Sequence, residues 1–223
     1  MSRARVHNFS ISLDGYGAGP NQSRDNPLGV GADNLHDWVI ATRTWRKMHS
    51  EKGGARGIDD EFMARGTVNI GAWIMGRNMF GPIRGAWPDD TWKGWWGDDP
   101  PFQLPVCVLT HYPRAPIKTE NGTIFHFITD GIHAALKRAG EAAGGKDVLV
   151  GGGVATIRQY LQSKLIDEMH LAVAPILLGS GAHLFADLDL PSFGYHCTEH
   201  VPTKSVTHVV LEKRLISGAT RKR

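Results

Sequence analysis

Short apolar runs alternate with amphipathic segments along the chain, a pattern that is typical of α/β proteins. Runs of strand length lie at residues 6–13, 70–75, 106–110, 124–128, 147–150 and 168–178. Segments with the apolar spacing or first-turn charges of a helix lie at 33–48, 58–65, 132–143 and 154–163. Two more strands, at 195–201 and 205–213, are expected to pair with each other in the antiparallel sense.

One long segment interrupts this alternation. Residues 81–105 contain four tryptophans and no clear periodicity, and long segments of this kind are usually functional or mobile loops. We expect the tryptophans either to cover an aromatic substrate or to hold the loop down as a local cluster; they are Trp87, Trp92, Trp95 and Trp96. No linker or repeat divides the chain, so residues 1–223 are expected to form a single domain with a core at 5–213 and a basic tail at 216–223.

The charge pattern does not indicate a nucleic-acid-binding protein. The formal net charge is +3, but the basic residues of the two terminal segments supply more than this, and the rest of the chain is slightly acidic. No apolar run approaches the roughly 20 residues that span a bilayer, and no signal peptide precedes the first strand. Two cysteines cannot form a disulfide framework. We therefore expect a cytoplasmic protein that binds neither nucleic acid nor membranes.

The strongest chemical signal is a glycine-rich turn between a strand and a helix. It comprises Gly151, Gly152, Gly153, Val154, Ala155 and Thr156. Glycine lets the backbone approach a phosphate closely, and the start of a helix offers unpaired N–H groups. The spacing matches neither the Rossmann pattern nor the P-loop, and a purely structural tight turn is the alternative.

Two other strand ends carry residues that suit a nucleotide. Gly76 and Arg77 follow the strand at 70–75, and the planar guanidinium of Arg77 suits bidentate phosphate contact. An exposed arginine at a strand end is an equal alternative. Thr110 and His111 end the strand at 106–110. Because α/β folds bind ligands at the carboxyl edge of the sheet, the three strand ends together predict one nucleotide laid across that edge.

The order of these motifs resembles dihydrofolate reductase and its relatives. The motifs are Ser12-Leu13-Asp14-Gly15-Tyr16, Ile74-Met75-Gly76-Arg77, Val108-Leu109-Thr110 and Val150-Gly151-Gly152-Gly153. A C-terminal block with Leu165-Ile166-Asp167-Glu168 and Ala174-Pro175-Ile176-Leu177-Leu178-Gly179 is similar to the reductase domain of the bifunctional riboflavin-pathway deaminase–reductase. The block is also similar to stand-alone bacterial proteins of the dihydrofolate-reductase family.

The resemblance implies a three-layer α/β/α fold around a mixed, mostly parallel sheet of about eight strands. It also implies an NADPH-dependent reductase that transfers hydride to a C=N or C=O carbon of a pterin- or pyrimidine-like molecule, and a homodimer. The Gly-Arg and glycine-rich turns are then expected to hold the cofactor phosphates, and Thr110 and His111 to lie near the adenosine. The zinc deaminase motifs are absent, so only the reductase step is expected.

Three residues are candidates for assisting hydride transfer: Asp14, His36 and Asp37. Asp14 belongs to a Leu-Asp-Gly segment and is otherwise a turn residue. His36 and Asp37 lie at the start of the helix predicted at 33–48, and a solvated helix face is their alternative role.

Two rival interpretations remain open at this stage. The same fold can serve as a catalytically inactive nucleotide-binding module. The segment from His196 to His200 matches the His-x-x-Glu-His pattern of inverted zinc peptidases. That chemistry needs both histidines on one helix face, whereas Gly194 and Pro202 flank a segment that suits a strand. We therefore expect no metal site.

Overall fold

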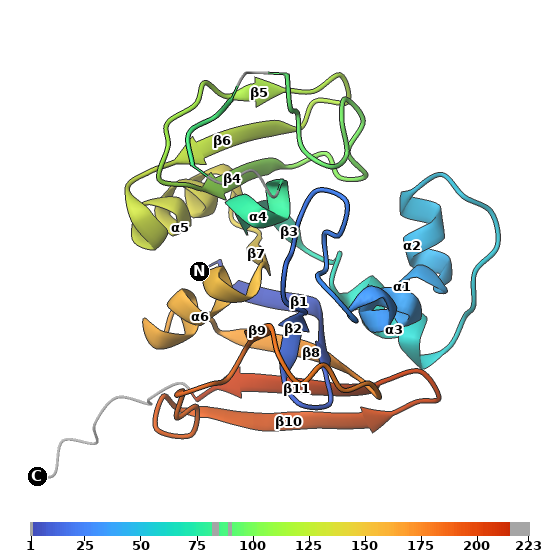
Figure 1. Cartoon of the computed structure of the whole chain (residues 1–223). Helices are drawn as coiled ribbons and strands as arrows, with labels where there is room; N and C mark the ends of the chain where they lie inside the picture. Colours follow the sequence, from blue (N-terminus) through green and yellow to red (C-terminus); the bar gives the residue numbers. More distant parts are fainter. Residues whose placement is uncertain (1, 82–84, 89–90, 215–223) are drawn as a thin grey trace, which may run out of the picture.

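A computed structural model of the protein describes residues 2–81, 85–88 and 91–214, and its central element is a nine-stranded sheet (Figure 1). The predicted basic tail at 216–223 lies outside the described residues. The strand order is β10-β11-β8-β1-β7-β3-β4-β6-β5. The strands are β1 (Ala4–Ser12), β3 (Ile70–Gly76), β4 (Pro105–Leu109), β5 (Ile117–Lys118), β6 (Ile124–Ile128), β7 (Asp147–Gly152), β8 (Glu168–Ala174), β10 (Tyr195–Pro202) and β11 (Thr207–Lys213). A second, two-stranded sheet pairs β2 (Tyr16–Ala18) with β9 (Ala182–His183).

The middle of the large sheet is parallel, and its edges are antiparallel. Strands β8, β1, β7, β3, β4 and β6 pair in the parallel sense. At one edge β11 and β10 add antiparallel strands, and at the other edge β5 does. The predicted mixed, mostly parallel sheet is confirmed, with nine strands where about eight were expected. Strand β8 is buried along most of its length, as parallel strands covered on both faces are.

Helices cover both faces of the sheet, which confirms the three-layer fold. The helical elements are η1 (Asp33–His36), α1 (Asp37–Ile40), α2 (Arg43–Met48), α3 (Ile58–Arg65), α4 (Arg77–Phe80), α5 (Gly131–Ala142) and α6 (Val154–Gln162). Helices α5 and α6 bury Ala139 and Tyr160 against one face. On the other face Trp38 of α1 and Met63 of α3 pack with Ala172 of β8. In Figure 1 these two groups of helices lie on opposite sides of the sheet. No helix of the described residues is long and apolar enough to cross a membrane.

The single helix predicted at 33–48 is wrong, because the chain forms three short helical elements there. Thr42 adopts an extended backbone conformation (φ −73°, ψ 152°) and caps α2. Its hydroxyl donates to the Val39 carbonyl at 2.7 Å and accepts from the Trp45 N–H at 3.2 Å. Threonine hydroxyls compete with the helix ladder in this way, so the apolar spacing continues across a break that it cannot reveal.

The strand predicted at 168–178 is too long, since β8 ends at Ala174. Pro175 has no N–H to donate and stops the ladder. The chain then forms a turn at which the Leu13 N–H donates to the Ile176 carbonyl. Strand β8 lies inside the sheet, and β10 and β5 are its edge strands, so β8 has no free edge with which to pair with a second copy. The homodimer stays a prediction.

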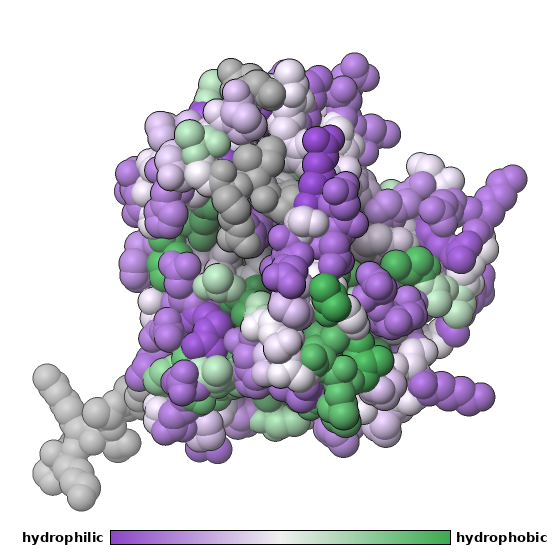
Figure 2. Space-filling model, in the orientation of Figure 1, coloured by the Kyte–Doolittle hydropathy of each residue, from purple (hydrophilic) through white to green (hydrophobic). Residues whose placement is uncertain are grey.

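Two exposed leucines lie in the turns that follow β1 and β8. Leu13 is 66% and Leu177 is 71% exposed. Figure 2 shows apolar side chains gathered over the turn that follows β1, on a face that is otherwise largely hydrophilic.

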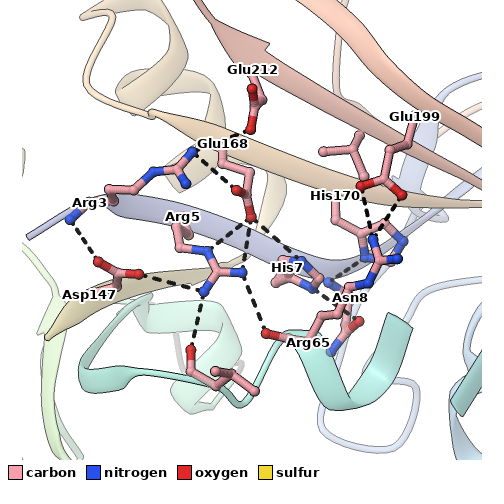
Figure 3. A network of polar contacts seen from close by, with 12 residues as sticks. Arg3, Arg5, His7, Asn8, Arg65, Asp147, Glu168, His170, Glu199 and Glu212 are labelled. Atoms are coloured by element: carbon pink, nitrogen blue, oxygen red, sulfur yellow. Dashed lines mark hydrogen bonds and ion pairs between the residues drawn. The ribbon is translucent and has the colours of Figure 1, made fainter. Parts of the chain in front are cut away.

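A buried ionic network joins three central strands (Figure 3). Arg5 of β1 lies 3.0 Å from the Glu168 carboxylate of β8 and 3.6 Å from the Asp147 carboxylate of β7. The same guanidinium donates to the carbonyls of Arg65, the last residue of α3, and of Val68, in the segment that follows. Removing one partner of such a buried pair leaves an uncompensated charge and is strongly destabilising. The network therefore fixes the register of β1 between its two neighbours.

A bulge in β1 connects this network to a chain of buried histidines. His7 and Asn8 together oppose the single residue His170, and Asn8 has a left-handed backbone (φ 57°). The Asn8 N–H donates to His170 Nδ1 at 3.1 Å, so the proton of the neutral His170 ring lies on Nε2 and points to His208 Nδ1, 3.0 Å away. His208 Nε2 in turn donates to Asp59 at 2.9 Å. These three hydrogen bonds can form together only if the His170 and His208 rings are both neutral.

These histidines predict a loss of stability in acid. Burial lowers the pKa of His7 to about 4 and that of His170 to about 2. The unfolded chain binds protons below its ordinary histidine pKa of about 6.5, and the folded chain does not. Above pH 6.5 the buried histidines do not reduce the free energy of unfolding. Between pH 6.5 and 4, each buried histidine lowers this free energy by about 1.4 kcal/mol for every unit by which the pH falls. Urea unfolding between pH 7.5 and 4.5 measures this slope.

A matched pair of variants isolates the contribution of one ring. His7→Gln is expected to reduce the slope by about 1.4 kcal/mol per pH unit, whereas His200→Gln, on the exposed edge strand β10, leaves it unchanged. Equal slopes in the two variants would contradict the assignment.

Candidate functional site

A cavity of about 1320 Å³ runs over the middle of the sheet, between the cover formed by α1–α3 and the tryptophan-containing loop at 81–105. Its floor includes Ser10 of β1, Trp73 of β3 and Leu149 of β7. We call the part at the glycine turns the cofactor end and the part beside α1 and α2 the substrate end. A cavity of this size is large enough for two small organic molecules side by side.

The cofactor end collects the three strand ends predicted from the sequence. The lining includes nine of the ten predicted cofactor residues: Gly76, Arg77, Thr110, His111, Gly151, Gly153, Val154, Ala155 and Thr156. Gly152 lies outside the lining, where it has a φ of +130° that favours glycine and precedes a cis peptide bond to Gly153. Strands β3, β4 and β7 are parallel, so their carboxyl ends meet at one edge of the sheet.

Two glycines at this end are required by close packing. A Cβ on Gly76 would overlap with the Thr156 hydroxyl at the start of α6. A Cβ on Gly151 would overlap with the indole nitrogen of Trp73. The first contact sets how closely β3 approaches α6, and the second sets how closely β7 packs against the Trp73 side chain of β3. Close packing is the structural role considered for the turn.

Gly153 has a different environment. It is the N-cap residue of α6 with φ −72°, a value that any residue adopts, and no atom lies within 4 Å of the position of a Cβ. Neither packing nor the φ angle requires glycine there. The N–H groups of Val154 and Ala155 at the first turn have no acceptor within the helix, and no side chain caps it. The helix start therefore presents donors and a positive dipole end to open space.

Arg77 places a cation beside these donors. Its guanidinium lies 3.7 Å from the centroid of the Trp87 ring and donates to the Gly85 carbonyl at 2.5 Å. Arg114, after β4, lies 4.8 Å from the same ring. Both guanidinium groups contact the Trp87 ring, and Arg77 itself lines the cavity. Arg77 therefore gives the cofactor end a positive charge, which suits phosphate groups.

The substrate end is more apolar and contains histidines. Val39 of α1 and Trp45 and Met48 of α2 line it together with His36 and His49. His49 stacks on Trp45 with ring centroids 4.1 Å apart, and its Nδ1 donates to the Trp45 carbonyl. Burial lowers the pKa of His36, and the neighbouring Asp37 carboxylate opposes this shift.

The structure separates the three residues predicted to assist hydride transfer. His36 lines the cavity, whereas Asp14 and Asp37 are not among its lining residues. Asp14 accepts hydrogen bonds from the Ser12 hydroxyl and from the N–H groups of Leu178 and Gly179, which lower its pKa to about 2. Asp14 therefore holds the turn after β8 as a fixed anion. Asp37 is exposed and accepts a 2.7 Å hydrogen bond from Asn34.

The tryptophans of the long loop form the local cluster that was one of their two expected roles. Trp87 packs edge-on against Phe80 and Phe127, and the Trp92 indole N–H donates to the Phe80 carbonyl. Trp95 and Trp96 line the cavity, so a covering role for these two stays a prediction.

The sequence reasoning missed the residues of the β1 bulge and of α2. Asn8 and Ser10 line the cavity floor, and the Ser10 hydroxyl accepts from the Trp38 indole N–H at 2.9 Å. Polar residues inside an apolar strand were the available signal, because a central strand buries both of its faces. His49 and Trp45 gave no signal, since the unbroken apolar spacing concealed the separate helix α2.

The metal-peptidase interpretation fails on secondary structure. His196 and His200 lie on strand β10, as the flanking glycine and proline predicted. The two rings therefore do not share the helix face that the motif requires.

The fold and the cavity define an α/β protein with a large cleft across the carboxyl ends of parallel strands. A family model described as the RibD C-terminal domain matches residues 6–210. The chain belongs to this family, which confirms the resemblance seen in the sequence.

Individual relatives agree with this assignment. The chain is 26% identical over 189 residues to the uncharacterized protein YwjB of Bacillus subtilis (strain 168), covering 84% of this chain and 86% of that protein. The crystal structure of a putative riboflavin biosynthesis protein from Shewanella sp. PV-4 aligns with a TM-score of 0.57 at 22% identity, over 96% of this chain and all of that one. Acinetobacter baumannii RibD aligns with a TM-score of 0.54 at 17% identity, over 96% of this chain and 59% of that one. The two structural matches show the fold.

The two kinds of glycine predict opposite effects of adding one methyl group. Gly151→Ala is expected to destabilise the protein by roughly 1–3 kcal/mol, because the methyl group collides with the rigid Trp73 ring. Gly153→Ala is expected to change the free energy of unfolding by less than about 0.5 kcal/mol. Urea unfolding of both variants measures the difference, and equal destabilisation would show that Gly153 is also a packing position.

Proposed function

We propose that this protein is an NADPH-dependent reductase that reduces a C=N or C=O bond of a pterin- or pyrimidine-like small molecule. The observation that carries the proposal is Gly153, a glycine that the fold does not require, beside the uncapped start of α6 and inside the cavity. A side chain there would fill the space through which a phosphate reaches the helix N–H groups.

The remaining cofactor residues fit a dinucleotide with several phosphates. Arg77 and the donors of α6 supply positive charge at adjacent points of the same edge. Thr110 and His111 extend the site along the end of β4, towards the side on which Arg114 stacks on Trp87. A reduced nicotinamide, when bound, supplies the hydride, and the task of the protein is to bind, orient and exclude water.

The substrate end supports an aromatic ring as the second ligand. Trp45 lies on the α2 side of the cavity, and Trp95, Trp96 and Phe102 lie on the loop side. Large aromatic side chains favour flat, apolar ligands because stacking adds to the burial of apolar area. The floor between them carries the polar groups of Asn8 and Ser10, which can orient a heterocycle by hydrogen bonds.

Cofactor binding tests this function directly. The purified protein is expected to bind NADPH more tightly than NADH, and Arg77→Ala to weaken NADPH binding by about 10-fold or more, the usual effect of losing a charge-assisted hydrogen bond. Arg138→Ala is the matched control, because Arg138 lies on α5 and contacts His126 outside the cavity lining. Isothermal titration calorimetry measures all three.

The outcomes separate the rival functions. Failure to bind either nucleotide, or equal losses in the two arginine variants, would contradict the reductase proposal. Tight NADPH binding without oxidation across a panel of pterins and pyrimidines would instead support a nucleotide-binding module without catalysis.

A further inference from the structure

Reducing a C=N or C=O bond needs a proton as well as a hydride. As the carbon accepts the hydride, the electron pair of the double bond moves to the nitrogen or oxygen, which must then be protonated. General acids contribute roughly 10²–10⁴-fold to such steps. The group that supplies this proton must therefore face the cavity in which the ring is bound.

The described part of the cavity lining contains cationic and neutral titratable groups and no carboxylate. These groups are His7, His36, Lys47, His49, Arg77, His111 and Tyr112. Asp14 and Asp37, the two acidic candidates, lie outside the lining. A proton donor at this site is therefore a nitrogen base or a phenol.

Four of these seven groups do not serve as the donor at the substrate end. Arg77, His111 and Tyr112 belong to the cofactor end, where Arg77 lies 5.4 Å from the Tyr112 ring. The His7 side chain is 3% exposed, and its Nε2 lies 3.7 Å from the Glu168 carboxylate in the ionic network.

The two remaining alternatives are Lys47 of α2 and His49, the residue that caps the end of α2. Lys47 is exposed to solvent, and His49 is fixed on Trp45 where the cavity joins a second, smaller pocket. His36 is half-buried and follows Leu35, which is fully buried in the cover.

The position of β2 connects His36 to the cofactor end. A Cβ on Gly17 would lie 2.7 Å from Val154 Cγ2, so β2 lies against the first turn of α6. Ala18 follows in the lining, and the Gly19 N–H binds the carbonyl of Leu28, another lining residue beside the substrate end. Strand β2 therefore extends from the glycine-rich turn towards the substrate end of the cavity, which His36 lines.

We propose that His36 is the catalytic proton donor, and that the cavity consequently selects an uncharged or anionic ring over a protonated, cationic one. The His36 imidazolium gives its proton to the ring nitrogen or oxygen that receives the electron pair, and solvent restores the proton to the imidazole. The inference rests on the proposed function, because it names the substrate class and the acid of the same site.

The surroundings of His36 are consistent with an imidazole that takes up a proton when the ligand binds. Burial favours the neutral imidazole in the empty site. The Asp37 carboxylate acts on His36 from the next position in the chain, and His7 of β1, Lys47 of α2 and His49 line the same cavity. An anionic or carbonyl acceptor adds a partner for the N–H of the charged ring, and this raises the pKa of His36.

Two ring systems of the same shape test the selection without the cofactor. Lumazine carries two carbonyl oxygens, whereas 2,4-diaminopteridine carries two amino groups in their place, which make a ring nitrogen basic. At pH 6 the wild-type protein is expected to bind lumazine at least about 10-fold more tightly. His36→Asp is expected to reverse this preference, because a carboxylate pairs with the protonated ring. His200→Gln, on the exposed edge strand, is the control and keeps the wild-type preference.

Proton uptake gives a second readout. Nuclear magnetic resonance titration of the His36 ring is expected to show its pKa rising when lumazine binds, and His36→Gln is expected to abolish the proton uptake measured by calorimetry in two buffers. Tighter binding of 2,4-diaminopteridine to the wild type, or unchanged proton uptake in His36→Gln, would overturn the proposal. NADPH is titrated separately, so that loss of cofactor binding contradicts the reductase function, whereas normal NADPH binding with the wrong ring preference contradicts only the role of His36.

Discussion

The site depends on how closely three parallel strands and one helix approach one another. Strand β3 meets the start of α6 because glycine lies at position 76, where a side chain would collide with Thr156. Strand β7 packs beside β3 because glycine lies at position 151, where a side chain would collide with Trp73. The contact of β3 with α6 brings Arg77 and the uncapped N–H groups of α6 to one edge of the sheet. The open space at Gly153 lies beside the same contact. Glycine thus allows close packing at Gly76 and Gly151 and leaves open space at Gly153.

The opposite side of the cavity depends on the buried polar network. Arg5 fixes β1 between β7 and β8, and the bulge at His7 and Asn8 directs polar groups to the cavity floor. Bulges next to active sites commonly serve to redirect side chains. The histidine chain from His170 to Asp59 also anchors α3, which carries part of the cover. A rigid floor between two separate covers leaves the middle of the sheet accessible to ligands.

Much of this arrangement could be predicted from the sequence, and the exceptions have physical causes. The strand and helix periodicities located most elements, including α3 at its observed bounds. Periodicity could not show the break at Thr42, because a hydroxyl that caps a helix leaves the apolar spacing intact. The gathering of the predicted cofactor residues along one cavity could be predicted, because these residues are contiguous at the ends of parallel strands. Their binding of a cofactor stays a prediction. The substrate end was only partly predictable: His36 was a candidate, but Asn8 and His49 reach the cavity through tertiary packing.

The central claim is that three strand ends bind one nucleotide together. Nuclear magnetic resonance spectra recorded while NADPH is added test this most directly. The account predicts that backbone amide shifts of Gly76–Phe80, Thr110–Tyr112 and Gly151–Thr156 change together, with one dissociation constant. Shifts confined to one of these segments, or changes that appear mainly elsewhere on the protein, would contradict it.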